Sequence, residues 1–153
     1  MAARRRPKNY WRQRVNPNLK LAYSINQTAD YLNKQADIVL KRDFGISYRQ
    51  YLIFVGLQYM QPCSQKQVAK FVQLTSAGVL HLLKELEHNQ WVKKEYDEVD
   101  RRTVVIMMTA AGSEAFDRMN IVLGDKLNEI IDLPASDVAQ AEEILGAIIR
   151  PKK

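Results

Sequence analysis

The side chains that most often carry catalysis or bind metal ions are scarce in this chain of 153 residues. It has two histidines, His81 and His88, and one cysteine, Cys63. Two helical turns would separate the histidines on a predicted helix, which is too far for one metal ion without further ligands. A lone cysteine has no partner for a disulfide or for redox chemistry. No nucleophile with its base and no glycine-rich phosphate loop is present either, so we predict no enzyme, no metal and no cofactor.

Basic residues are the other candidates, because lysine and arginine bind the phosphates of nucleic acids. The net charge is +6, and the first twenty residues carry seven bases and no acid. These bases are Arg4, Arg5, Arg6, Lys8, Arg12, Arg14 and Lys20. The other 133 residues hold 16 bases and 17 acids, so the rest of the chain is close to neutral. We expect residues 1–18 to form a disordered basic arm, for which contact with DNA and simple solvation both stay open.

Two long helical regions are predicted at the ends of the remaining chain. Apolar residues at three- and four-residue steps predict an amphipathic helix over 21–44, which Gly45 ends. Thr109 is expected to begin a second helical region over 110–150, which Pro134 interrupts. Both regions present apolar faces.

Shorter helices are predicted between these two regions. Ser47 with Gln50 and Ser64 with Gln67 form capping boxes, and Thr75 is a further N-cap. The inward residues of the last two short helices are expected to be Val68, Phe71, Val72, Val79, Leu82, Leu83 and Leu86. The result is two short helices separated by a tight turn.

A charged hairpin is predicted to follow these helices. Trp91–Tyr96 and Thr103–Met108 have the composition of two strands, joined by the polar loop 97–102. A helix-turn-helix followed by such a wing suits duplex DNA, because a helix fits the major groove while a narrow basic loop reaches the minor groove. A merely solvated loop is the competing interpretation, which the acidic Glu95, Asp97 and Glu98 favour.

Several segments together resemble the multiple antibiotic resistance regulator (MarR) family. They are Gln65-Lys66-Gln67-Val68-Ala69, the apolar pattern Val79, Leu82, Leu83 and Leu86-Glu87, then Asp100-Arg101-Arg102, and Thr109-Ala110-Ala111-Gly112. The match covers about Ser47 to Phe116. The resemblance implies a mainly α fold with a small β-hairpin wing, in one domain over 19–153. Its winged helix-turn-helix lobe would span about 47–109, and its dimerisation helices about 19–44 and 110–150, interleaved in a homodimer.

By this resemblance, the helix over 75–87 is the recognition helix. Its outward residues would be Ser76, Ala77, Gly78, Leu80, His81 and Lys84. In the wing, Arg102 matches the arginine that enters the minor groove in the family. Asp100 matches the acid that orients this arginine, and Arg101 would contact a DNA phosphate. Members commonly have hydroxyl and arginine side chains where this chain has glycine, leucine and histidine, so we expect few bidentate contacts with bases.

The exit from this helix also departs from the family pattern. Gln90 stands where the family usually has glycine. We therefore expect Asn89 to adopt the left-handed conformation there.

The resemblance implies a sequence-specific transcriptional regulator, and a repressor more often than an activator, that binds an inverted-repeat operator as a homodimer in the cytoplasm. Release by a small aromatic or phenolic effector is a further expectation. Its pocket would be lined by Tyr23, Tyr31, Tyr51, Tyr59 and Met60. Aromatic residues at helical spacing are more commonly core, so this pocket is a hypothesis. The alternative function is a winged-helix module that binds proteins and has no sequence-specific affinity for DNA. No apolar run has the length of a membrane span, and we expect no membrane partner.

Overall fold

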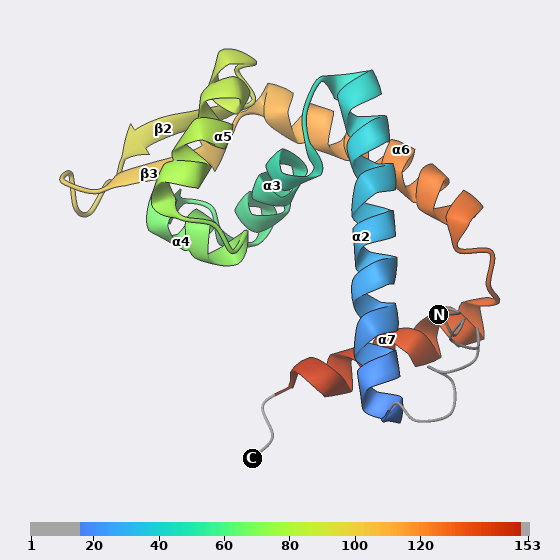
Figure 1. Ribbon diagram of the computed structural model, residues 1–153. Helices are drawn as coiled ribbons and strands as arrows, with labels where there is room; N and C mark the ends of the chain where they lie inside the picture. Colours follow the sequence, from blue (N-terminus) through green and yellow to red (C-terminus); the bar gives the residue numbers. More distant parts are fainter. Residues whose placement is uncertain (1–15, 151–153) are drawn as a thin grey trace, which may run out of the picture.

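The computed structural model describes residues 16–150 and is mainly helical with a small sheet. The elements, in order, are α2 (Pro17–Phe44), α3 (Tyr48–Met60), β1 (Cys63–Ser64), α4 (Gln65–Phe71), α5 (Ser76–His88), β2 (Val92–Tyr96), β3 (Val104–Met108), α6 (Ala110–Ile130) and α7 (Ala135–Ile149). In Figure 1, α3, α4, α5 and the sheet form a lobe on one side of the long α2. α6 leaves this lobe and crosses α2, and α7 follows it after a short link. The predicted fold class is confirmed.

The first described helix begins earlier than the sequence suggested. α2 starts at Pro17, and the side chain of Asn16 accepts the N–H of Asn18 at 2.8 Å. Proline suits the first helical position because a backbone N–H there would have no partner within the helix, so its absence costs nothing. The predicted arm over 1–18 lies outside the described residues for most of its length. Its last two residues are helical, so that boundary was wrong by two positions.

The predicted helix starts are confirmed. Ser47, Ser64, Thr75 and Thr109 each accept the backbone N–H three residues on, and the first two form complete capping boxes. Gly45 ends α2 with a φ of +71°, a conformation that glycine adopts without steric cost. These local hydrogen bonds define where the helices of the lobe begin.

The sheet has three strands in the order β1-β3-β2, all antiparallel, and not two as predicted. Cys63 pairs with Ile106, and Ser64 pairs with Val105. A strand of two residues is too short to show an alternating pattern in the sequence. Through this strand the start of α4 is joined directly to the base of the wing.

The core lies inside the lobe and reaches the ends of α2 and α6 that face it. Its fully buried large side chains include Leu40, Ile53, Phe54, Leu57, Leu83, Leu86, Ile106 and Met119. The predicted inner residues Val68, Val72, Val79, Leu83 and Leu86 are buried, and Leu82 is half-buried. Phe71 is a correction, because it is 41% exposed. Its ring lies over Gly56, where an added Cβ would come within 2.9 Å of the ring.

Gly112 lets α6 pack against the start of the wing. A Cβ at this position would lie 1.9 Å from the carbonyl oxygen of Trp91, which is sterically impossible. Thr109 secures the same junction, since its N–H donates to Trp91 O at 3.0 Å and its hydroxyl to Gln90 O at 2.7 Å. The Thr-x-x-Gly pattern thus has a physical reason: it brings the first turn of α6 into contact with the chain entering β2.

The chain-end helices are exposed in one protomer. α7 has no buried residue, although Val138, Ile144, Leu145, Ile148 and Ile149 lie on it. The first half of α2 likewise exposes Leu19 and Leu21. Within residues 16–150, no helix combines the length and the apolar character that a membrane crossing requires.

Candidate nucleic-acid interface

α5 presents a buried face to the core and a polar face to solvent. Val79, Leu83 and Leu86 are fully buried, which fixes the rotation of the helix about its axis. Of the six residues predicted to face outward, Ser76, Ala77, Leu80, His81 and Lys84 are exposed and Gly78 is half-buried. These side chains therefore share one accessible face, as a recognition helix requires.

Two glutamines hold α5 in place, and sequence reasoning missed both contacts. The side chain of Gln65 on α4 donates to the carbonyl oxygen of Ser76 at 2.8 Å, at the first turn of α5. The side chain of Gln50 on α3 donates to the carboxylate of Glu85 at 2.5 Å and to the carbonyl oxygen of Leu82 at 3.4 Å. The only signal in the sequence is the capping-box position of Gln50, which does not reveal its long-range partners.

The turn after α5 differs from the prediction. Asn89 has a φ of −74° and ends the helix in right-handed geometry. Gln90 takes the left-handed conformation, with a φ of +58°. The expectation that Asn89 would replace the family's glycine was therefore wrong. Gln90 occupies that position and adopts its conformation, in which its N–H donates to Glu87 O at 2.9 Å.

Two aspartates build the tip of the wing. The carboxylate of Asp97 accepts the N–H groups of Val99 and Asp100 at 2.9 and 2.8 Å. That of Asp100 accepts the N–H of Arg102 at 3.1 Å and the hydroxyl of Thr103 at 3.0 Å. Asp100 thus orients Arg102 through its main chain, where the resemblance implied contact with its side chain. Both carboxylates are directed into the loop.

The basic side chains of the wing tip point outward. Arg101 and Arg102 are exposed, and within residues 16–150 neither guanidinium forms an ion pair. Two acids nearby are already neutralised, because Glu95 contacts Lys93 at 2.5 Å and Glu87 contacts Lys94 at 3.0 Å. The free guanidinium groups make the tip able to bind phosphate or a narrow minor groove.

The surroundings of Cys63 and of the two histidines give no sign of a reactive or metal-binding site in the described part of the chain. Cys63 is buried in β1, and burial raises the pKa of its thiol, which disfavours the reactive thiolate. His81 and His88 are exposed on α5. In the described part of the chain, no three metal-binding side chains come together.

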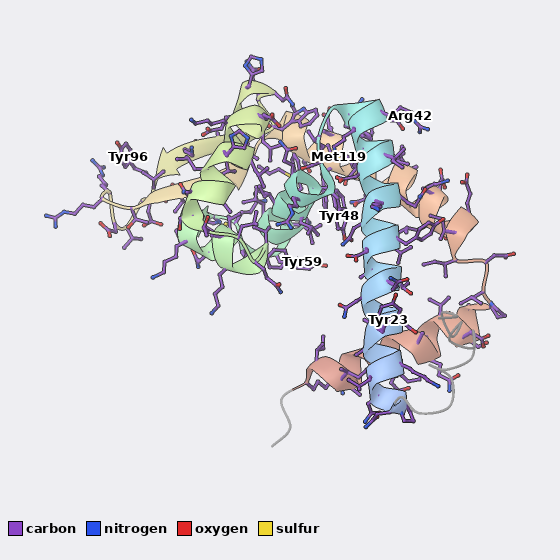
Figure 2. All side chains as sticks on the ribbon, in the orientation of Figure 1. Tyr23, Arg42, Tyr48, Tyr59, Tyr96 and Met119 are labelled. Atoms are coloured by element: carbon purple, nitrogen blue, oxygen red, sulfur yellow. The ribbon has the colours of Figure 1, made fainter. Side chains whose placement is uncertain are left out.

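The five residues predicted to line an effector pocket lie in different surroundings in one protomer. Tyr23, Tyr31 and Tyr59 are exposed, and Figure 2 shows Tyr23 on α2 and Tyr59 at the edge of the lobe. Tyr51 packs against Tyr48 and Phe116 and donates its hydroxyl to Asn120 at 2.7 Å. Met60 is half-buried against the core.

A different hollow lies between α2, α3 and the end of α4. Its volume is about 550 Å³, and it is lined by Asn33, Asp37, Ser47, Tyr48, Arg49, Leu52, Phe71, Val72 and Gln73. We call it the α3 hollow. None of the five predicted residues lines it.

The lobe and the chain entering it match a known family of regulators. The family model described as transcriptional regulator SarA/Rot matches residues 37–119, which is more than half of the chain. The chain belongs to the SarA/Rot family of transcriptional regulators. The match runs from the second half of α2 to the middle of α6 and includes α5 and the whole wing.

Among curated proteins, this SarA/Rot member is similar to the HTH-type transcriptional regulator MgrA of Staphylococcus aureus. The two are 26% identical over 134 residues, which cover 86% of this chain and 90% of MgrA. Among solved structures, it is similar to the transcriptional regulator BldR of Sulfolobus solfataricus. That TM-score is 0.80 at 23% identity, covering 90% of this chain and 97% of BldR.

A MarR-family regulator solved with DNA has the same fold. Sco3205 of Streptomyces coelicolor, in complex with DNA, superposes with a TM-score of 0.74 at 23% identity, covering 90% of this chain and 91% of that one. The MarR-like fold expected from the sequence is confirmed. The protein is a transcriptional regulator with a winged helix-turn-helix of the MarR type.

Proposed function

We propose that this regulator is a homodimeric repressor that binds an inverted-repeat operator through α5 and the wing. The observation that carries the proposal is the arrangement of α5, whose apolar face is closed into the core while Ser76, Ala77, Leu80, His81 and Lys84 share the exposed face. Arg101 and Arg102 extend from the same lobe without ion-pair partners among residues 16–150. The DNA-bound Sco3205, which has the same fold, supports this use of the lobe.

The dimer is proposed to form through α7 and the first half of α2. Both segments expose several large apolar side chains, and exposed apolar surface of this kind marks protein interfaces. A two-fold axis would place both α5 helices on one side of a duplex. The half-sites would then lie one helical turn apart, about 34 to 36 Å between centres.

Selection of duplexes from a random pool tests the proposal directly. The purified full chain is expected to enrich one inverted repeat, and binding is expected to weaken steeply with salt as phosphate contacts are lost. The same selection with an R102A variant should yield weaker binders with less preference in the flanking minor groove. A protein-binding module would enrich no sequence at any salt concentration, and that result would overturn the proposal.

A small aromatic acid is proposed to act at the α3 hollow. The hollow brings Tyr48, Leu52 and Phe71 next to Arg49, which has no ion pair within residues 16–150. A planar ring would pack on the apolar side chains, and its carboxylate would reach the guanidinium.

Titrating sodium salicylate into the protein-duplex complex is expected to release DNA from the wild type and much less from R49A. Benzyl alcohol, which lacks the carboxylate, is the matched control compound. Equal release from both proteins, or none from either, would remove the effector from the proposal.

A further inference from the structure

The two capping boxes have the same sequence pattern but very different surroundings. Gln50 and Gln67 each accept the N–H of their own N-cap serine, at 2.7 and 2.8 Å. Gln67 is exposed, and its side chain bonds only to that serine among the described residues. Gln50 is 2% exposed and is the buried polar side chain of the described core. The local capping requirement is identical, so it does not explain why one glutamine is buried.

Gln50 reaches from α3 to α5 with the other half of its amide. Its NH₂ group donates to Glu85 at 2.5 Å and to the carbonyl oxygen of Leu82 at 3.4 Å. These two residues are neighbours on one face of α5, three positions apart. Leu82 is half-buried, and Glu85 is exposed at the edge of the outward face that carries Leu80, His81 and Lys84.

The same turn of α3 is also bonded to α2. The carboxylate of Asp37 accepts the N–H of Tyr48 at 2.7 Å, and Lys41 lies 3.7 Å from that carboxylate. Figure 2 shows Tyr48 between α3 and α2. One turn of α3 therefore holds α2 on one side and α5 on the other. We call Asp37, Ser47, Tyr48, Gln50 and Glu85 the α3 joint.

Hydrogen bonds at the α3 joint fix the orientation of α5 relative to α3 in a way that apolar contacts do not. A buried leucine could slide or rotate against α5 at small cost, whereas an amide with two acceptors has one favourable geometry. Buried polar groups need not add stability, because a hydrophobic replacement of similar size is often neutral, but they can specify one arrangement. The joint thus fits a role in positioning more than a role in stability.

We propose that Gln50 is a positioning residue that sets the rotation and height of α5 relative to α2. In a dimer held by α2 and α7, this geometry determines the distance between the two recognition helices. Gln50 therefore determines which half-site spacing the dimer accepts, while the face of α5 determines which bases it prefers. The inference rests on the proposed function, since spacing is defined only for a dimer on a repeat.

The test is random-pool selection with Q50L, E85A and E85Q, and with Q67L as the matched capping-box control. Wild type, Q67L and E85Q, whose new amide oxygen can still accept from Gln50, are expected to select one spacing. Q50L and E85A are expected to select the same half-site bases over several adjacent spacings. Their affinity for the wild-type spacing should fall about tenfold if only about one molecule in ten then holds α5 in the matching position.

The outcomes separate positioning from simple folding. Thermal unfolding is expected to be close to wild type for E85A, whose side chain is on the exposed side of α5, so its altered spacing cannot come from a damaged lobe. If Q50L and E85A select the single wild-type spacing with unchanged affinity, Gln50 only caps α3 and the inference is wrong. If wild type itself enriches no inverted repeat, the proposed function fails first, and the inference falls with it.

Discussion

The winged-helix lobe and the chain-end helices differ in how they treat their apolar side chains. The lobe buries Ile53, Phe54, Leu57, Val79, Leu83 and Leu86 completely within one protomer. α7 is as apolar in pattern, yet none of its residues is buried. A lobe that closes its own core can fold in one chain, whereas α7 can remove its apolar face from water only against another surface. The two regions are therefore expected to respond differently to mutation.

The largest effect is expected from a charge on α7. Ile148→Lys should convert the dimer to a monomer and lower operator affinity by about 100-fold or more, because two linked half-site contacts become one. The lobe should keep its helical circular dichroism. Sedimentation velocity and duplex titration measure both effects, with Gln140→Lys as the control for added charge on the same helix. An Ile148→Lys variant that remains a dimer would disprove the assigned interface, and a monomer that binds with wild-type affinity would disprove binding as a dimer.

The second largest effect is expected on the folding stability of the lobe. Gly112→Ala would place a Cβ 1.9 Å from Trp91 O, so the start of α6 must move away from the wing. The free energy of unfolding should fall by about 2 to 4 kcal/mol in urea titrations. Gly124 on the same helix has open space around it, and Gly124→Ala should stabilise by up to about 1 kcal/mol. Equal behaviour of the two variants would contradict the close contact.

A smaller effect is expected at the wing tip, without any change in folding. Arg102→Ala should weaken operator binding by about 1 to 3 kcal/mol and leave thermal stability and dimerisation unchanged. Arg118→Ala on α6 removes the same charge away from the tip and is the control. Fluorescence anisotropy at fixed salt measures both. An unchanged affinity for Arg102→Ala would remove the wing from the interface.

The smallest effect is expected from Glu98. This exposed carboxylate has no ion-pair partner within residues 16–150 and follows Asp97 at the tip. Glu98→Gln should tighten binding by about 0.5 kcal/mol at low salt by removing repulsion from phosphates, and the gain should shrink as salt is raised. Glu142→Gln on α7 is the control. A gain that does not depend on salt would rule out this electrostatic cause.

Features that depend on contacts between residues close together in the chain could be predicted from the sequence. Features that depend on contacts between distant residues could not. Ser47, Thr75 and Thr109 were correctly assigned as helix starts, because each bonds to a backbone N–H three residues away. β1 was missed because its two residues carry no periodic pattern and pair with residues more than forty positions later. The contact of Gln50 with Glu85 crosses 35 residues and leaves no local signal.

Two wrong predictions have steric and local causes. Asn89 was favoured for the left-handed position on its general preference, but as the C-cap of α5 it keeps right-handed geometry, and the left-handed residue is Gln90. Phe71 was expected in the core on periodicity alone. Gly56 leaves a flat surface for its ring at the edge of the lobe, so the ring packs there while one side stays exposed.

The most direct test of the central claim compares two duplexes: the selected inverted repeat and the same duplex with one half-site scrambled. If α5 and the wing read DNA as a dimer joined through the chain ends, sedimentation should find two chains on the intact repeat. Affinity should then drop by about 100-fold or more on the scrambled one. One chain bound to each duplex with equal affinity would contradict a dimeric reader of an inverted repeat.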